Sequence, residues 1–145
     1  MQLIENPFAS PVFSDIVQSS AQYVDQAYSY VKSITIPASD QLLNQVVSLD
    51  RDADFLLAGI MITSATSPLA QIQFADSQGQ LMSNDYIGLG AFLQGGLPVP
   101  YAIVPWRIFP AGGRILINAQ DLSGVDNTVQ LVFKGIKRFR LDARG

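Results

Sequence analysis

Short segments with the residue pattern of β-strands follow one another from Ser33 almost to the end of the chain. The stretch SITIPA (33–38) alternates polar and apolar residues, and NQVVSLD (44–50) follows it. DFLLAGIMIT (54–63) is an apolar run of the length expected for a strand that is buried on both faces. AQIQFADSQGQLM (70–82) has the pattern of a hairpin whose turn is DSQG.

Three further strands are expected between Tyr101 and Phe139, separated by PAGG (110–113) and DLSGVDN (121–127). Pro105 and Pro110 flank Trp106 and cannot donate backbone hydrogen bonds, which predicts an edge strand or a kinked strand there. The segment between the two strand groups, 83–100, is rich in Gly and Pro and is expected to be a long loop. Strands of this length with turn residues between them predict an all-β fold, an antiparallel β-sandwich or barrel.

The first part of the chain has a different character. Apolar residues between positions 12 and 31 fall near helical spacing, and Ser10 with Pro11 could form an N-cap followed by proline at the first helical position. The tyrosines at positions 23, 28 and 30 suit an extended arm or an early strand equally well. With 145 residues the chain has the size of one domain. We therefore expect an N-terminal arm or helix over 1–32, a β-sandwich over 33–139 and a basic tail over 140–145.

The composition points to a surface that other chains cover. Hydrophobic residues make up 48% of the sequence and charged residues only 14%, against roughly 25% charged in a typical soluble domain. A monomer with so few charges tends to associate, so we expect a homo-oligomer. No run reaches the ~18 apolar residues of a membrane span, and the start lacks the pattern of a secretory signal. We expect no membrane partner and a chain that is cytosolic when made.

The residues that carry chemistry give no convincing active site. The chain has no Cys and no His, which removes thiolate chemistry and the commonest metal ligand and general base. Asp50, Asp52 and Asp54 match the first ligand positions of a calcium loop, but Phe55 and Met61 replace its glycine and its bidentate glutamate. Most other aspartates sit at expected turns, where they cap backbone donors. The sequence therefore predicts no enzyme, no metal and no cofactor.

Charge is distributed unevenly along the chain. The last twelve residues hold five of the nine basic residues and carry a net charge of +4, whereas the preceding part carries −7. This asymmetry predicts either a solvated end or an interaction tail that binds an acidic neighbour, with nucleic acid the weaker option because few aromatic side chains accompany the charges. The residues expected to bind a partner are Phe8 and Phe13 in the arm and Lys137, Arg138, Phe139 and Arg140 near the end.

Trp106 is the single tryptophan and allows two interpretations. With Tyr86, Phe92 and Tyr101 nearby in the sequence, its ring could form a surface platform for a sugar or a protein. The other interpretation, which we favour from the sequence, is that it packs into one end of the sandwich core.

Three stretches resemble a known class of proteins. FADSQGQLMSNDYIGL, PVPYAIVPWRIFPAGGRILINAQDLSG and NTVQLVFKGIKRF resemble the small β-sandwich structural proteins of tailed bacteriophages, the capsid decoration (cement) proteins and related head or tail accessory proteins. The resemblance covers about Asp50 to Phe139. It implies a jelly-roll-like fold, assembly as an oligomer, often a trimer, on the major capsid protein or another virion protein, and no enzymatic activity.

From the sequence we therefore expect a virion structural protein that is present in the host cytoplasm during assembly. The alternative is a carbohydrate-binding β-sandwich module with Trp106 and the central loop as its site.

Overall fold

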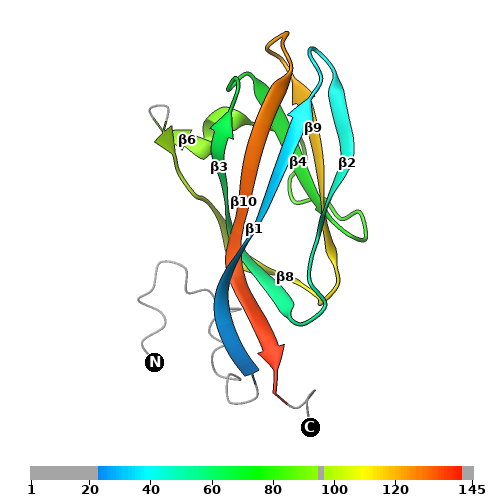
Figure 1. Cartoon of the computed structure of the whole chain (residues 1–145), viewed down its shortest axis with the longest axis vertical. Helices are drawn as coiled ribbons and strands as arrows, with labels where there is room; N and C mark the ends of the chain where they lie inside the picture. Colours follow the sequence, from blue (N-terminus) through cyan, green and yellow to red (C-terminus); the bar gives the residue numbers. More distant parts are fainter. Residues whose placement is uncertain (1–22, 95–96, 142–145) are drawn as a thin grey trace.

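A computed structural model describes residues 23–94 and 97–141, and it is built almost entirely of strands. In chain order the elements are β1 (Tyr23–Ile36), β2 (Gln41–Ser48), β3 (Asp54–Ala65), β4 (Ala70–Asp76), β5 (Ile87–Gly88), the 3-10 helix η3 (Leu89–Phe92), β6 (Leu93–Gln94), β7 (Leu97–Pro98), β8 (Tyr101–Phe109), β9 (Arg114–Asp121) and β10 (Asn127–Arg140). Figure 1 shows them in an elongated body with β1 and β10 side by side.

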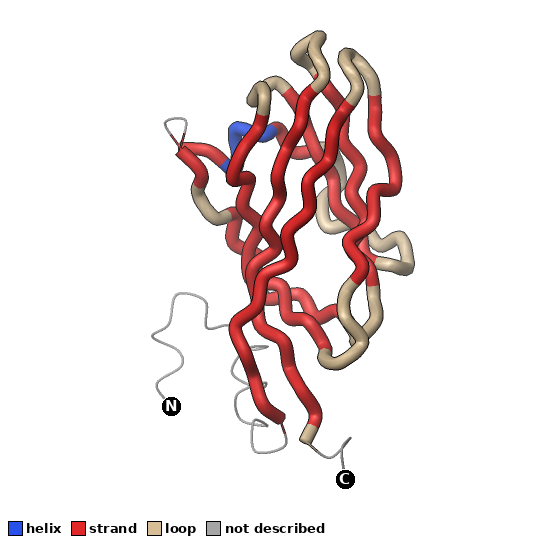
Figure 2. Tube along the Cα trace, in the orientation of Figure 1, coloured by secondary structure: helices blue, strands red, loops and turns tan. Residues whose placement is uncertain are grey.

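The strands form two antiparallel four-stranded sheets that pack face to face. The first sheet, called sheet A here, has the order β1-β10-β3-β8, and the second, sheet B, has the order β2-β9-β4-β5. The first strand of the sandwich therefore pairs with the last, β2 with β9, β3 with β8 and β4 with β5. This nested pairing is one long two-stranded ribbon wrapped around a core, which is the jelly-roll arrangement (Figure 2). The predicted β-sandwich is thus confirmed.

Alternating side chains from both sheets fill the space between them. Sheet A contributes Phe55, Leu57 and Phe133, and sheet B contributes Phe74 and Ile117, all of which are buried. The ring of Phe74 meets that of Phe133 edge-on across the sandwich at a centroid distance of 5.7 Å. Every second residue of a strand points to the same face, so the same strands must present a different set of side chains on their outer faces.

Of the alternatives for the first 32 residues, the early strand and not the helix forms from Tyr23 onward. β1 begins at Tyr23 and pairs with β10 over its whole length. Tyr30, Ile34 and Ile36 are buried at even positions, the two-residue period of a strand rather than the spacing of a helix. Because β10 provides a long partner, tyrosine and β-branched residues prevail over the helical spacing of the sequence. Residues 1–22 lie outside the described part of the chain.

The Gly- and Pro-rich middle is more ordered than the loop expected from its composition. It forms β5, η3 and the short β6–β7 hairpin. Leu89 and Phe92 of η3 are buried in the core, where the ring of Phe92 lies 5.0 Å from that of Tyr101. The expectation that Pro105 lies in an edge strand is confirmed, because β8 ends sheet A.

Several aspartates act at turns, as expected. Asp121 accepts hydrogen bonds from the backbone N–H groups of Ser39, Ser123 and Gly124. A hydrogen bond from the Ser123 hydroxyl is the largest cause that lowers the pKa of Asp121 from 3.8 to about 2, and the backbone donors add to it. Asp121 therefore ties the turn after β1 to the turn after β9.

Gly135 is required by the close approach of β10 to β3. A Cβ atom at this position would overlap the backbone carbonyl of Leu56, at a point where the register between the two strands shifts. We predict that Gly135→Ala lowers the free energy of unfolding by about 3 kcal/mol, because a backbone atom cannot move aside cheaply. Gly88→Ala, whose Cβ would meet nothing within 4 Å, is the control and should change stability little. Equal denaturation midpoints for the two variants would contradict the prediction.

Candidate interaction surface

The outer face of sheet A carries apolar residues in rows that run across the strands. One row joins all four strands, because Ala27 lies opposite Ile136, Ile136 opposite Leu56, and Leu56 opposite Ile108. A second row joins Val31, Val132 and Met61. Directly opposed residues share a face, and these positions alternate with those of the core. Two apolar rows therefore cross the outer face of sheet A, with the row of Ser29, Lys134 and Gly59 between them. Sheet B covers only the inner face.

This outer face is accessible in the described chain. Val31 keeps 57% of its surface exposed, Ile108 51% and Val104 59%, whereas Leu56 in the centre is buried. A hollow of about 430 Å³ lies on the sheet, lined by Ala58, Gly59, Pro100, Ala102, Trp106, Lys134 and Gly135. Exposed large apolar side chains beside a hollow are a feature of sites of protein association.

Trp106 lies at this surface and outside the core, so the interpretation of its ring as a core side chain is wrong. It is half-buried and lines the hollow together with Gly59 and Gly135. The physical reason is the alternation along β8: Phe109 points into the core, so Ile108 and Trp106 both point outward.

Lys137 is not part of an exposed tail. It is 5% exposed, and its Nζ lies 2.7 Å from Asp50 Oδ2, 3.2 Å from Asp52 Oδ1 and 4.1 Å from the ring centre of Tyr28. Burial lowers the pKa of Lys137, but the hydrogen bonds to Asp50 and Asp52 outweigh it and raise the pKa above its ordinary value. The hydrogen bond from Lys137 in turn holds the pKa of Asp50 below its usual value. Asp50 and Asp52, two of the three aspartates that match the first positions of a calcium loop, thus serve as ion-pair partners of Lys137.

Arg138 is held in the same way by β1. Its Nε and Nη2 donate to the two carboxylate oxygens of Asp25 at 2.9 and 2.8 Å, which is a two-pronged ion pair. Its guanidinium also lies 4.7 Å from the ring centre of Tyr23. The basic residues of the expected tail at positions 137 and 138 therefore hold β10 to β1 and to the turn before β3.

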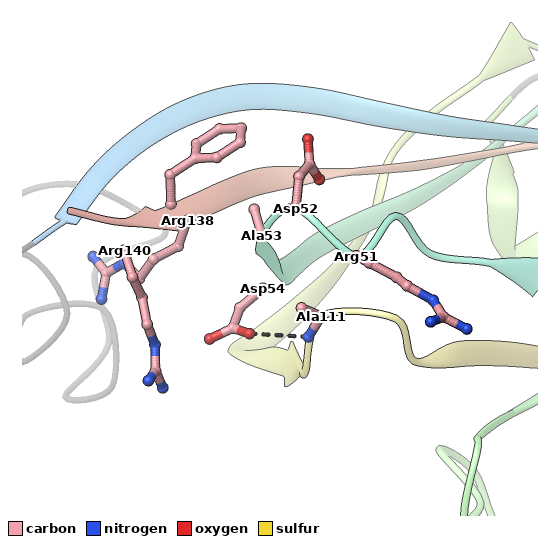
Figure 3. Close-up of a pocket in the computed structure, with 8 residues that line it drawn as sticks. Arg51, Asp52, Ala53, Asp54, Ala111, Arg138 and Arg140 are labelled. Carbon is pink, nitrogen blue, oxygen red and sulfur yellow. Dashed lines mark hydrogen bonds between the residues drawn. The ribbon is translucent and has the colours of Figure 1, made fainter. Parts of the chain in front are cut away.

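Phe139 and Arg140 are placed differently. Phe139 is half-buried and Arg140 is exposed, and both belong to the end of β10. They line a groove of about 560 Å³ together with Arg51, Asp52, Ala53, Asp54, Ala111 and Arg138 (Figure 3). Within the groove Asp54 accepts a hydrogen bond from the backbone N–H of Ala111 at 2.9 Å. The guanidinium groups of Arg51 and Arg140 point away from each other, so the groove offers separate positive charges rather than one converging site (Figure 3).

Two residues that were expected to bind a partner, Phe8 and Phe13, lie outside the described residues. Within 23–94 and 97–141, no group of three or more Asp, Glu, His or Cys side chains is placed to hold a metal ion. Over the same residues no helix has the length and apolar character to cross a membrane.

The sequence analysis did not predict the apolar rows on the outer face of sheet A. Part of their signal is in the sequence, because the apolar stretch 54–63 indicates a strand that is buried on both faces. Only the strand register shows that β10, β1 and β8 add apolar residues to the same outer side.

Comparisons with known proteins identify no family and two solved viral structures of limited similarity. No known protein family matches the chain, and no curated protein matches it in sequence. Two solved structures with partial similarity are those of the infectious bursal disease virus VP2 subviral particle (8% identity, TM-score 0.30) and of infectious bursal disease virus Gx strain (9% identity, TM-score 0.29). The alignments cover 80% and 81% of this chain but only 37% and 36% of those chains.

The ion pairs of Lys137 predict a measurable contribution to stability. Lys137→Met leaves Asp50 and Asp52 without their cation, but both carboxylates stay half-exposed and hydrated. We expect a loss of about 1–2 kcal/mol in the free energy of unfolding, less than for a fully buried pair. Lys134→Met, three residues earlier on the same strand and exposed, is the matched control and should change it by less than about 0.5 kcal/mol. Chemical denaturation measures both, and indistinguishable values would refute the role of Lys137.

Proposed function

We propose that this chain is a virion structural protein that acts by binding its own copies and a neighbouring virion protein. The observation that carries the proposal is the pair of apolar rows on the outer face of sheet A, which include exposed Val31 in one row and exposed Ile108, next to buried Leu56, in the other. A partner that covers these rows removes their apolar area from water, which contributes roughly 25 cal/mol per Å².

The fold and the composition agree with this role. Jelly rolls of two sheets occur in viral capsid domains and in lectin domains, and a fold alone does not determine which function it serves. The low charge of the chain, 14%, favours a protein that spends its functional life in an assembly. More specifically, we propose that the chain is a capsid decoration (cement) protein or a head accessory protein of a tailed phage. It is made in the host cytoplasm and joins the virion as an oligomer, for which the phage resemblance implies a trimer.

The groove at the end of β10 supplies a second contact in this proposal. Arg51 and Arg140 are exposed there, whereas Arg138 is engaged with Asp25. Half-buried Phe139 adds an apolar component that salt does not screen. We propose that this groove faces an acidic surface of the particle.

A carbohydrate-binding role is the second candidate, and one observation favours it. Trp106 also lines a groove of about 530 Å³ with the polar side chains of Asp76, Gln80 and Arg107. Arg107 Nη2 and Asp76 Oδ2 are 3.2 Å apart, so both are held in place beside the ring. An aromatic ring next to fixed polar groups is a suitable arrangement for binding a sugar.

The virion proposal predicts that the chain travels with particles. Lysates that contain the tagged chain and virus particles are separated on a density gradient at low salt and at high salt. We expect the chain in the particle band at low salt and a reduced fraction at high salt, because the Debye length falls from about 8 Å at 0.15 M to about 3 Å at 1 M. Arg140→Gln should reduce the fraction at low salt, and Arg114→Gln, an exposed arginine outside the groove, should not. A chain that stays at the top of the gradient at low salt would refute the proposal.

The carbohydrate alternative predicts a separate outcome. If the groove binds glycans, Trp106→Ala should abolish retention on a glycan array while the protein stays folded, because Trp106 lies outside the core. Met82→Ala, which changes another side chain of the same groove, is the control for general damage to it and should keep binding. Absence of glycan retention by the wild-type chain would remove this candidate.

A further inference from the structure

Four strands form the lateral edges of the two sheets, and three of them are poor templates for an additional strand. β8 contains Pro105, which has no N–H to donate, and its register with β3 shifts between Leu57 and Gly59. β2 is interrupted at Asn44, whose φ is 56°. β5 is only two residues long. Interruptions of this kind protect sheet edges from pairing with other chains.

β1 is the exception among these edges. It is 14 residues long, contains no proline and pairs with β10 without a register shift from Tyr23 to Ile36. No other strand of residues 23–94 and 97–141 pairs with its second side. Val24, Tyr28 and Val31 are large side chains that remain exposed along it, at 47%, 36% and 57%. An edge of this length with exposed apolar side chains is a template for strand addition.

The residues of β1 match a second copy of β1 in one antiparallel register. Directly opposed residues must share a face of the sheet, so odd positions face odd positions and even positions face even ones. With Ser29 opposite Ser29 of the second copy, the other opposed pairs are Tyr23 with Thr35, Val24 with Ile34, Asp25 with Ser33, Gln26 with Lys32, Ala27 with Val31, and Tyr28 with Tyr30. Each of the three exposed apolar side chains then faces an apolar or aromatic one, and no like charges oppose each other.

Neighbouring registers lose this match. A centre at Tyr28 places Val31 opposite Asp25 of the other copy. A centre at Tyr30 places Val31 opposite Ser29. Registers further from Ser29 leave more of the strand unpaired. The complementarity of β1 with itself is therefore specific to the register centred on Ser29.

We infer that two copies of this chain join through β1, antiparallel and related by a two-fold axis at Ser29, so that the two A sheets become one continuous eight-stranded sheet. The contact is isologous, with each copy giving and receiving the same residues. The inference deepens the self-association in the proposed function and specifies its interface. It gives a dimer contact, so a trimer of the kind that the phage resemblance implies would need a different surface.

A single-cysteine pair of variants tests the register directly, because the chain has no cysteine of its own. In the inferred dimer the Cα atoms at position 29 lie about 4.5–5.5 Å apart, within the range of a disulfide. Ser33 is exposed and on the same face of β1, but its two copies lie about 27 Å apart in this register, eight residues along the strand. Under mild oxidation Ser29→Cys should form covalent dimers in most chains, and Ser33→Cys should not.

A second pair of variants tests the contact without cross-linking. The wild-type chain should have twice its monomer mass of 15.7 kDa in light scattering. Val31→Asp should convert it to monomers that keep a β-rich circular dichroism spectrum, because the substitution places a charge in the contact. Val104→Asp, at a similarly exposed valine on the opposite edge strand of sheet A, should stay dimeric.

The outcomes separate this inference from the proposed function. A monomeric wild-type chain, or equal cross-linking of Ser29→Cys and Ser33→Cys, would overturn the inferred pairing. The free edge of β1 would then be available for a strand of another protein. Binding to particles in the gradient experiment would be unaffected by that result. Conversely, dimers with the Ser29 register that never travel with particles would support the pairing and refute the virion role.

Discussion

The jelly roll is organised around the pairing of β1 with β10. These are the first and the last strand of the sandwich, and their unbroken register from Tyr23 with Arg140 to Ile36 with Asn127 closes the jelly roll. β10 also pairs with β3, so it lies between the earliest strand and the longest buried run of the chain. Without β1, β10 would become an edge strand, and the outer row that begins at Ala27 would be shortened.

The ion pairs lie at the end of this ribbon that sheet B does not cover. The ends of β1 and β10 extend together beyond sheet B, where no second sheet covers them (Figures 1 and 2). At this end Arg138 is paired with Asp25, and Lys137 with Asp50 and Asp52. In each pair the basic side chain is buried and the carboxylate is partly exposed. Loss of a carboxylate would leave a buried cation without that partner, so the pairs favour one register over its alternatives. Charges that looked like a tail in the sequence thus fix the geometry of the strands that carry them.

The same ribbon carries the exposed features of sheet A. They are the long edge of β1 and the apolar rows on the outer face. Asp121 and the glycine at position 135 serve the body, and their roles need no partner. The outer rows of sheet A and the edge of β1 have no comparable role within the described chain.

The residue pattern was enough to predict the class of the fold, the buried strands Asp54–Ala65 and Asn127–Arg140 in outline, the edge position of Pro105 and the use of aspartates at turns. These features are local, because they depend on two-residue periodicity and on the chemistry of single side chains. Strand pairing in space was needed to show that residues 23–32 form a strand, that Trp106 points outward and that Lys137 and Arg138 are buried. Each of these depends on which strand lies alongside, across as many as 113 residues of sequence for Arg138 and Asp25, and no local pattern contains that information.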